Sequence, residues 1–592
     1  MKPRVRSADF RLRLYAVAAI LALAATSLVV RAVDLQLLHN EFYQAQGNER
    51  FLREIEVPTS RGTITDRNGE PLAVSSPVES VWADPRELLQ HTDRLPELAD
   101  ALGIPLEPLT QRLAQRADRE FVYLRRHMNP DAAEEILALE IPGVNTQREF
   151  RRFYPLGDAM AHVLGFTNID ERGQEGLELA FDEWLSGKPG LKRVIRDRIG
   201  NVVENVDLVR PAAPGRDLAL SIDRRIQYLA HRELKAALLE NDASSGSVVV
   251  LEVATGEVLA MVNQPSYNPN AREFDELAAR RNRAVTDVFE PGSVIKAFTI
   301  AAALETGRVT PQTVIDTTPG SMPLAGHTIH DIRNFGRIDL THVLTKSSNV
   351  AATKLALEME DAHLYDVLQR FGFGTVTGCG FPGESPGVLP EPRGWGVLEK
   401  ATISYGYGLS VTALQLAQAY AALGNGGQLL PPTFVHGARN QARSVIDPQI
   451  AATLLEMLET VTGAEGGGQR ARVRGYRVAG KTGTSRKASA GGYERRYVSV
   501  FAGLVPASDP RFAVAVMIND PKGRDYYGGL VAAPVFAAVM DGALRLMDVP
   551  PDQPETWLVE LPKPADALPG ALPLEAEAVP DGLPGVAVGA PR

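Results

Sequence analysis

Three short groups of residues in this chain have the types and the order that serine-based acyl transfer needs. The first motif is Ser293-Val294-Ile295-Lys296, the second is Ser347-Ser348-Asn349 and the third is Lys481-Thr482-Gly483. Each pattern alone is short enough to occur by chance in a chain of this length. Because all three occur in this order, they indicate an enzyme that forms a covalent acyl intermediate on a serine.

The first motif has the spacing of a nucleophile and its base. Pro291-Gly292 predicts a helix that continues to about Thr306, so backbone N–H groups and the positive helix end lie near the Ser293 hydroxyl. Lys296 follows three residues later and therefore lies on the same helix face. A lysine accepts a proton only in its neutral form, which burial and a second cation such as Lys481 favour.

The other two motifs supply groups that handle protons and align a peptide. Ser347 is placed to relay a proton to the leaving amine, and Asn349 to hold the lysine of the first motif or a substrate amide. Residues 481–484 are predicted to form a strand at a sheet edge, whose backbone aligns the peptide. Thr482 and Thr484 are then expected to hydrogen-bond a terminal carboxylate.

The same residues admit two other interpretations. Serine is a common helix N-cap, and Asn349 and Thr482 could serve as cap or turn residues, which would make the motifs structural. Residues 475–482 also satisfy the Walker A pattern of nucleotide-binding loops. A P-loop must follow a buried strand and begin a helix. Here arginines precede the segment and glycines follow it, so an ATPase is disfavoured.

Composition excludes several other kinds of protein. A net charge of -10 over 592 residues gives no electrostatic footprint for nucleic acid. The single cysteine, Cys379, excludes an internal disulfide framework and a cysteine metal cluster. His327 and His330 have the spacing of two zinc ligands but lack a third, and they are predicted to lie in a surface loop. Glu252 and Glu257 are predicted to be solvated charges. No metal or cofactor is therefore expected.

The elements that would position the three motifs form an α/β domain. Residues 217–239 predict a strand and a helix. Residues 247–253 and 256–262 predict a β-hairpin, and residues 498–505 and 512–518 predict a second one. Strands at both ends of this region, with helices between them, predict one sheet that is closed by the last strands.

The N-terminal segment predicts a single membrane-spanning helix. Leu14 to Val30 is a run of 17 residues without a charge, just long enough to cross a hydrocarbon core of about 30 Å. Basic residues outnumber acidic ones before it, so the positive-inside rule keeps residues 1–13 cytoplasmic and sends the rest of the chain across the membrane. We interpret residues 14–32 as an uncleaved anchor. The alternative is a signal peptide cleaved after Ala22-Leu23-Ala24.

Composition also suggests the remaining boundaries. A helix is predicted from Arg31 to Arg53, and residues 33–215 form a mixed α+β domain with a boundary at Pro211 to Pro214. Residues 216–548 form the α/β domain. Residues 549–592 are rich in proline and alanine without periodicity, and they are predicted to be a disordered tail.

Several longer segments make the chain resemble the class B penicillin-binding proteins, and within that family its division-specific branch. The matching segments are Arg61 to Gly69, Arg152-Phe153-Tyr154-Pro155, Gly173 to Glu178, Glu290-Pro291-Gly292, Lys346 to Val350, Ser404 to Gly408 and Tyr526-Tyr527-Gly528-Gly529. The resemblance implies a single transmembrane helix, a mixed α+β pedestal domain of the dimerisation type and a penicillin-binding/β-lactamase-like transpeptidase domain. In this last domain a central antiparallel sheet is flanked by helices.

The resemblance also implies a role for each residue of the three motifs in this chain. Ser293 would be the acyl-ester nucleophile and Lys296 its base. The backbone N–H groups of Ser293 and Thr484 would form the oxyanion hole. The other catalytic and substrate-binding residues would be Ser347, Asn349, Lys481, Thr482, Gly483 and Thr484.

The resemblance also implies a substrate and partners. The substrate would be the D-alanyl-D-alanine end of a peptidoglycan stem peptide, with an amine of a neighbouring stem as acceptor, and β-lactams would acylate the same serine. One helix would hold the chain in the cell inner membrane, with the catalytic domain in the periplasm. Partners would be the membrane proteins of the divisome, including a glycan polymerase.

The second motif departs from the form found in β-lactamases. Ser348 stands where that form has aspartate, and no Glu-x-x-Leu-Asn segment lies between Ser347 and Lys481. Both differences favour a transpeptidase over a β-lactamase. Elongation-type transpeptidation, D,D-carboxypeptidase activity and a non-catalytic role as a β-lactam sensor or division scaffold remain alternatives.

Overall fold

The computed structural model describes residues 8–34, 52–196, 202–271, 277–489 and 492–557. Helix α1 (Ala8–Val33) contains the whole predicted anchor, residues 14–32. Its side chains from residue 11 to residue 33 are exposed, and with a mean hydropathy of 2.2 this stretch is long and apolar enough to cross a membrane. A second apolar stretch, residues 528–546, is 56% buried and belongs to the core. The predicted helix from Arg31 to Arg53 mostly lies outside the described residues, and its last two residues begin strand β1.

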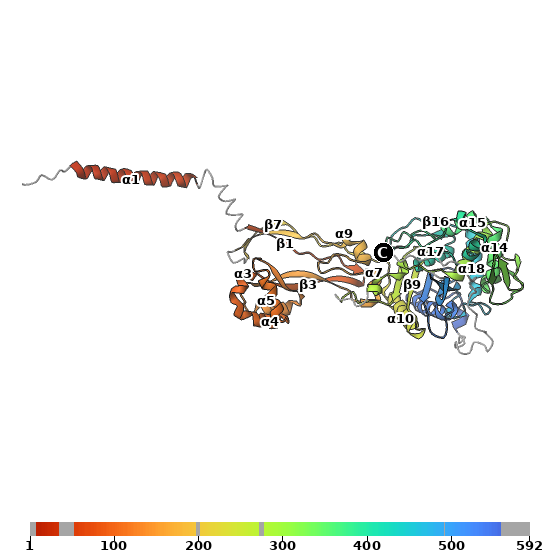
Figure 1. Ribbon diagram of the computed structural model, residues 1–592. Coiled ribbons are helices and arrows are strands. Elements are labelled where there is room, and N and C mark those ends of the chain that lie inside the picture. The colour runs from red at the N-terminus through yellow and green to blue at the C-terminus, as the bar shows by residue number, and fades with distance from the viewer. Residues whose placement is uncertain (1–7, 35–51, 197–201, 272–276, 490–491, 558–592) are drawn as a thin grey trace, which may run out of the picture.

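The pedestal, strands β1 to β7 with their helices, is built from two sheets. A three-stranded antiparallel sheet has the order β1 (Leu52–Val57), β6 (Gly190–Arg196) and β7 (Val202–Arg210). The second sheet contains β2 (Ile64–Thr65), β3 (Pro71–Ala83), β4 (Val122–Met128) and β5 (Val144–Phe153). Short helices cover one end of it: α3 (Pro85–Leu88), α4 (Leu95–Leu102), α5 (Leu106–Ala114) and α6 (Pro130–Leu137) (Figure 1).

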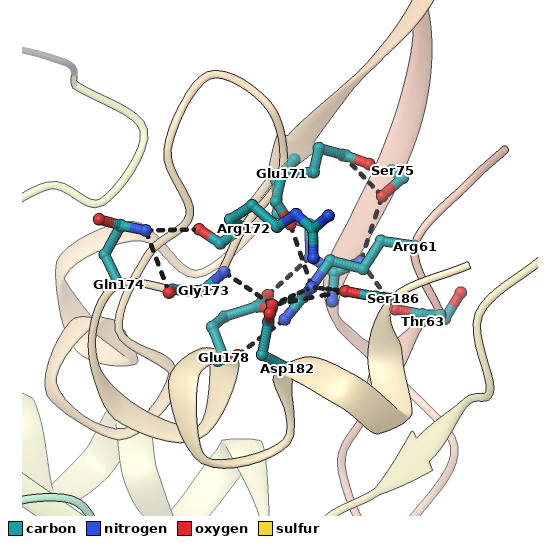
Figure 2. Close-up of polar contacts among 12 residues, drawn as sticks. Arg61, Thr63, Ser75, Glu171, Arg172, Gly173, Gln174, Glu178, Asp182 and Ser186 are labelled. Carbon is teal, nitrogen blue, oxygen red and sulfur yellow. Dashed lines mark hydrogen bonds and ion pairs between the residues drawn. The ribbon is translucent and has the colours of Figure 1, made fainter. Parts of the chain in front are cut away.

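A buried ion cluster joins the pedestal segments that carry the family motifs. Arg61 Nε lies 2.6 Å from Glu178 Oε2, and Arg152 Nε lies 2.6 Å from Glu178 Oε1. Arg61 Nη1 also contacts Asp182 Oδ1 at 2.6 Å (Figure 2). Glu178 belongs to α8 (Gly176–Ala180) and is fully buried, so the two guanidinium groups offset its charge away from water. Asp182 is partly exposed at the side of the cluster. We call Arg61, Arg152, Glu178 and Asp182 the pedestal cluster.

The large domain, which follows the pedestal, has a five-stranded antiparallel sheet with the order β10-β9-β19-β18-β17. Its strands are β9 (Ser245–Glu252), β10 (Val258–Gln264), β17 (Ala479–Ser489), β18 (Gly492–Val505) and β19 (Phe512–Asn519). Pairing of β9 with β10 and of β18 with β19 confirms both predicted hairpins. The last three strands bring the third motif into the same sheet as the first hairpin, and β17 lies at its edge.

Helices cover both faces of this sheet. Successive side chains of a strand point to opposite faces, and here the side chains on both faces are apolar. Val248 and Val250 of β9 face one apolar layer, which includes α10 (Arg224–Glu240) and α20 (Ala533–Leu546). Val249 and Leu251 face the other. That second layer contains α12 (Lys296–Glu305), α17 (Ala413–Gly424) and α18 (Pro448–Thr462). Every residue of β9 is buried, as expected for a strand between two helical layers. This architecture confirms the predicted fold class.

The pedestal and the large domain meet at the motif segment Asp66-Arg67-Asn68. Strand β8 (Leu218–Ala219), at the start of the large domain, pairs in parallel with β2 of the pedestal. Arg67 Nη2 lies 3.2 Å from Glu257 Oε2 and 3.6 Å from Glu252 Oε2. The prediction that Glu252 and Glu257 are solvated is therefore wrong. The pedestal covers the turn between β9 and β10, and both glutamates are buried there with cationic partners.

The prediction that residues 549–592 form a disordered tail is also wrong for residues 549–557. The hydroxyl of Tyr476 donates to the carbonyl of Val549 at 2.6 Å, and the N–H of Gln553 donates to the carbonyl of Gly475 at 2.9 Å. Residues 549–557 thus satisfy polar groups of the turn before β17, which keeps them on the large domain. The remainder of the predicted tail lies outside the described residues.

Candidate active site

The first motif lies at a tight turn, where the chain enters the core of the large domain. Gly292–Ile295 forms a 3₁₀ turn and α12 begins only at Lys296, so Ser293 precedes the α-helix that we expected to contain it. Gly292 has a φ of +59°, which favours glycine, and a Cβ there would lie 3.2 Å from the carbonyl oxygen of Thr484. The turn therefore presses the serine backbone against β17. Ser293 is only 1% exposed.

Lys296 binds the first two motifs together. Its Nζ donates to Ser293 Oγ at 2.7 Å and to Asn349 Oδ1 at 2.6 Å. It also lies 2.6 Å from the Ser347 carbonyl oxygen and 3.1 Å from Ser347 Oγ. The side chain is completely buried. The N-cap interpretation of Ser293 is wrong, because its side chain caps no helix and its oxygen lies beside this amine.

The second motif connects α13 (Leu340–Thr345) to α14 (Asn349–Glu358). Ser347 has a φ of +58°, an unusual backbone conformation for a residue with a side chain. Its Oγ accepts from both Lys296 and Lys481, the latter at 3.0 Å. This strained serine thus lies between the two cations, where a proton could pass through its hydroxyl.

The third motif lies on β17, the edge strand of the sheet. Lys481 is fully buried, and its Nζ contacts Ser347 Oγ and the Thr482 carbonyl oxygen. A Cβ at Gly483 would lie 2.5 Å from the Pro291 carbonyl oxygen, so only glycine allows β17 to approach the nucleophile turn this closely. The hydroxyl of Thr484 already accepts from the N–H of Gly528 at 3.0 Å. Thr482 is only half-buried.

The structure brings all five predicted catalytic residues into one connected network, which we call the lysine cluster: Ser293, Lys296, Ser347, Asn349 and Lys481. Gly483, Thr482 and Thr484 adjoin it on β17. The Walker A interpretation is wrong, because residues 479–489 form a strand and no helix begins after Thr482. The cluster can remove the proton of a serine, return a proton to a leaving group and align an extended peptide along an open sheet edge.

Sequence reasoning missed the roles of two largely buried carboxyl groups, those of Glu290 and Asp331. Glu290 Oε1 accepts from the Gly408 N–H at 2.8 Å and from the Tyr493 hydroxyl at 2.9 Å, and burial raises the pKa of Glu290 to about 7. Asp331 accepts from the second motif, and burial raises its pKa as well. Glu290 adjoins a recognisable Pro-Gly turn, which is a local signal. Asp331 has none, because its partners are 17 or more residues away along the chain.

The two histidines considered as zinc ligands, His327 and His330, lie at the two ends of a short strand. His327–His330 forms strand β13, which pairs with β12 (Ser321–Leu324) in a small hairpin, so the predicted surface loop is wrong. The carbonyl of His330 accepts from Asn349 Nδ2 at 3.0 Å. In the part of the chain that the structure describes, no three histidine, cysteine or acidic residues are arranged to hold a metal ion.

Comparison with known proteins agrees with this geometry. A family model described as the penicillin-binding protein transpeptidase domain matches residues 246–541, and one described as the penicillin-binding protein dimerisation domain matches residues 56–220. The chain is 45% identical over 542 residues to the peptidoglycan D,D-transpeptidase FtsI of Escherichia coli, covering 90% of this chain and 91% of that protein. It is 44% identical to the probable peptidoglycan D,D-transpeptidase PbpC of Pseudomonas aeruginosa, covering 91% and 96%.

Solved structures show the same organisation. Penicillin-binding protein 3 of Mycobacterium tuberculosis, in complex with aztreonam, superposes with a TM-score of 0.65 at 28% identity, covering 84% of this chain and 99% of that one. The transpeptidase domain of Burkholderia pseudomallei penicillin-binding protein 3 gives a TM-score of 0.53 at 40% identity, covering 57% and 98%. The chain therefore belongs to the class B penicillin-binding proteins, in which a dimerisation domain precedes a transpeptidase domain.

Proposed function

We propose that this chain is a peptidoglycan D,D-transpeptidase that cross-links stem peptides at the division septum through an acyl-enzyme on Ser293. The observation that carries the proposal is the position of Lys296 Nζ, within 2.7 Å of both Ser293 Oγ and Asn349 Oδ1 inside a buried site. The names of the E. coli and P. aeruginosa relatives support the same activity.

Each residue of the lysine cluster has a task in this reaction. Lys296 takes the proton of Ser293 while Oγ attacks the carbonyl carbon of the penultimate D-alanine. The bond to the terminal D-alanine then breaks, and Ser347 passes a proton from the two lysines to the leaving amine. An amine of a neighbouring stem attacks the ester, so that a new peptide bond forms and Ser293 regains its proton.

The substrate would lie along β17. An edge strand offers unpaired backbone groups to an extended peptide, and Lys481 with Thr482 would bind its terminal carboxylate. The Thr484 hydroxyl accepts from the N–H of Gly528 and still has its own proton to donate to the carboxylate. Its backbone N–H, together with that of Ser293, would bind an oxyanion. β-Lactams would acylate Ser293 by the same route.

The proposal extends to location and partners. Helix α1 would anchor the chain in the cell inner membrane with the pedestal and the large domain in the periplasm, since basic residues precede its apolar run. The pedestal would contact the membrane proteins of the divisome, including a partner glycan polymerase. Residues 33–215 remain the proposed limits of the pedestal. The large domain would begin at residue 216 and extend past 548, since residues 549–557 lie on it.

Labelling with a fluorescent penicillin tests the site. The full-length protein should be labelled, Ser293→Ala should lose the label, and Ser444→Ala, which alters an exposed serine, should keep it. Label on Ser293→Ala would reject the assignment of the nucleophile. Depletion of the protein in cells tests the division role: filaments are expected, and round cells would reject it. A Ser293→Ala chain that still supports division would favour a scaffold.

A further inference from the structure

The carboxylate of Asp331 collects three hydrogen bonds from the second motif and the helix that follows it. Oδ2 accepts from Ser348 Oγ at 2.6 Å. Oδ1 accepts from the backbone N–H of Asn349 at 2.6 Å and from that of Val350 at 3.0 Å. These two N–H groups belong to the first turn of α14, where a negative charge is favourable. Asp331 thus fixes the start of the helix that carries Asn349.

The residue before Asp331 fixes the side chain of Asn349. The carbonyl of His330 accepts from Asn349 Nδ2, which leaves Oδ1 of the same amide directed at Lys296 Nζ. A rotated amide would instead place its NH₂ group against the lysine. The β12–β13 hairpin that supplies both partners is itself held in place, because Ile329 is fully buried in one apolar cluster with Val350 and Ala352.

We propose that Asp331 is a positioning residue for acylation, and that it supplies from the β12–β13 hairpin the carboxylate that β-lactamases carry in the middle of their second motif. Ser348 occupies that middle position here. Its Oγ accepts from the Ala351 N–H at 3.0 Å and donates its own proton to Asp331. Ser348 and the distant Asp331 together therefore accept hydrogen bonds from the first N–H groups of α14, as a single aspartate can at a helix N-cap. The inference rests on the proposed acyl-transfer function.

Relocating the carboxylate tests this directly. The full-length protein in detergent is compared with Asp331→Asn, Ser348→Asp and the double variant that carries both changes. The second-order rate of acylation by a fluorescent penicillin is measured together with the non-covalent affinity and the melting temperature. Asp339→Asn is the matched control, because Asp339 caps the neighbouring helix α13 without contacting the lysine cluster.

Each single change should slow acylation by about 100-fold with little change in non-covalent affinity, because Asn349 and Lys296 lose their alignment. In Ser348→Asp the loss arises because two carboxylates face each other at hydrogen-bond distance. The double variant again has one carboxylate at the helix start. It should therefore be acylated at least about tenfold faster than either single variant. The control should keep the rate of the wild type.

Two results would overturn the proposal: an Asp331→Asn variant that acylates like the wild type, or a double variant no faster than either single one. If Asp331→Asn does not fold, Ser348→Ala decides, since it removes the bond to Asp331 together with the cap on the Ala351 N–H and changes no charge. It should fold and lose about tenfold in rate, and an unchanged rate would refute the proposal. Failure of the acyl-transfer function itself is distinguishable, because the wild type would then not be labelled at all.

Discussion

The pedestal cluster and the lysine cluster are both buried polar assemblies, but they differ in how their charges are balanced. In the pedestal, Arg61 lies 2.6 Å from the carboxylates of both Glu178 and Asp182 (Figure 2). Arg152 lies 2.6 Å from the carboxylate of Glu178. In the large domain, each of the four hydrogen bonds of Lys296 described above goes to a neutral oxygen. The two clusters therefore differ at hydrogen-bond distance: carboxylates contact the arginines directly, whereas Asp331 interacts with Lys296 through its charge.

The contrast separates a structural charge from a reactive one. A carboxylate partner stabilises the charged form of a buried cation, so the ion pairs of the pedestal hold three distant segments together. A neutral acceptor favours the charged form of an amine less than a carboxylate does. The proton of the amine can then move to and from neighbouring oxygens, as acyl transfer requires.

The largest effect should come from removing the reactive cation. Lys296→Met should lower the rate of acylation by a fluorescent penicillin by about 10²- to 10⁴-fold, because the base is lost. The melting temperature should stay the same or rise, since taking a charged amine out of water is costly. Lys235→Met, at a half-exposed site, serves as the control. A strong fall in melting temperature would show that the lysine is structural, and the comparison would fail.

Removing a carboxylate from the pedestal cluster should have the opposite effect: it should lower stability and leave the acylation rate unchanged. Glu178→Gln leaves two buried arginines with one carboxylate fewer and should lower the free energy of unfolding of the pedestal by about 3–5 kcal/mol. Urea unfolding followed by limited proteolysis measures this loss, with Glu183→Gln on the exposed side of α9 (Asp182–Leu185) as the control. Molecules that remain folded should acylate at the rate of the wild type. A loss of acylation without a loss of stability would contradict the division of roles.

Glu290 sharpens the comparison, because this buried carboxyl group is held by a backbone N–H and a phenol instead of by an arginine. Burial raises its pKa from the ordinary value of 4.5 to about 7, so the folded protein retains the proton longer than the unfolded chain. Its contribution to stability is complete below 4.5 and falls as pH rises towards 7, by as much as about 3 kcal/mol.

Urea unfolding at the two ends of this pH range, for the wild type and Glu290→Gln, measures the predicted loss. Relative to the glutamine variant, the wild type should become less stable as pH rises. A difference between the two proteins that does not change with pH would mean that Glu290 titrates normally, in which case burial has not kept it protonated.

The smallest effect is expected at the exposed ion pair beside the second motif. Lys346 Nζ lies 2.7 Å from Glu465 Oε2, but the glutamate side chain is 69% exposed. Water and salt screen such a pair, so Glu465→Gln should leave both the melting temperature and the acylation rate unchanged within error. A clear loss of acylation would show that charge balance at the rim of the site also matters.

Local patterns predicted the fold well. The alternating and apolar runs of β9, β10, β18 and β19 identified both hairpins, because side-chain period and short turns are local properties. The first motif was recognisable for the same reason, since Ser293 and Lys296 are separated by one helical turn. The 3₁₀ turn at Ser293 was not predicted, because it depends on the close approach of β17 to Gly292.

What the sequence could not reveal are contacts made by tertiary packing. Asp331 reaches Ser348 only because the β12–β13 hairpin packs against α14. The burial of Glu252 and Glu257 is another such case, because Arg67 of the pedestal and distant residues of the large domain, Gly437 and Arg511, cover their turn. A proline-rich composition predicts disorder from residue 549. It carries no information about Gly475 and Tyr476, whose polar groups bind the first residues of the tail.

The joint at Asp66-Arg67-Asn68 also has a mechanical consequence. Asp66 Oδ2 accepts from the N–H of Arg224, the N–H of Arg67 donates to the carbonyl of Ile222, and the Arg67 side chain contacts both glutamates of the β9–β10 turn. A joint held at several points resists bending in more than one direction. A force on the pedestal would therefore act first on the β9–β10 turn, and the strand order connects β9 through β19 and β18 to β17, the strand that carries Lys481.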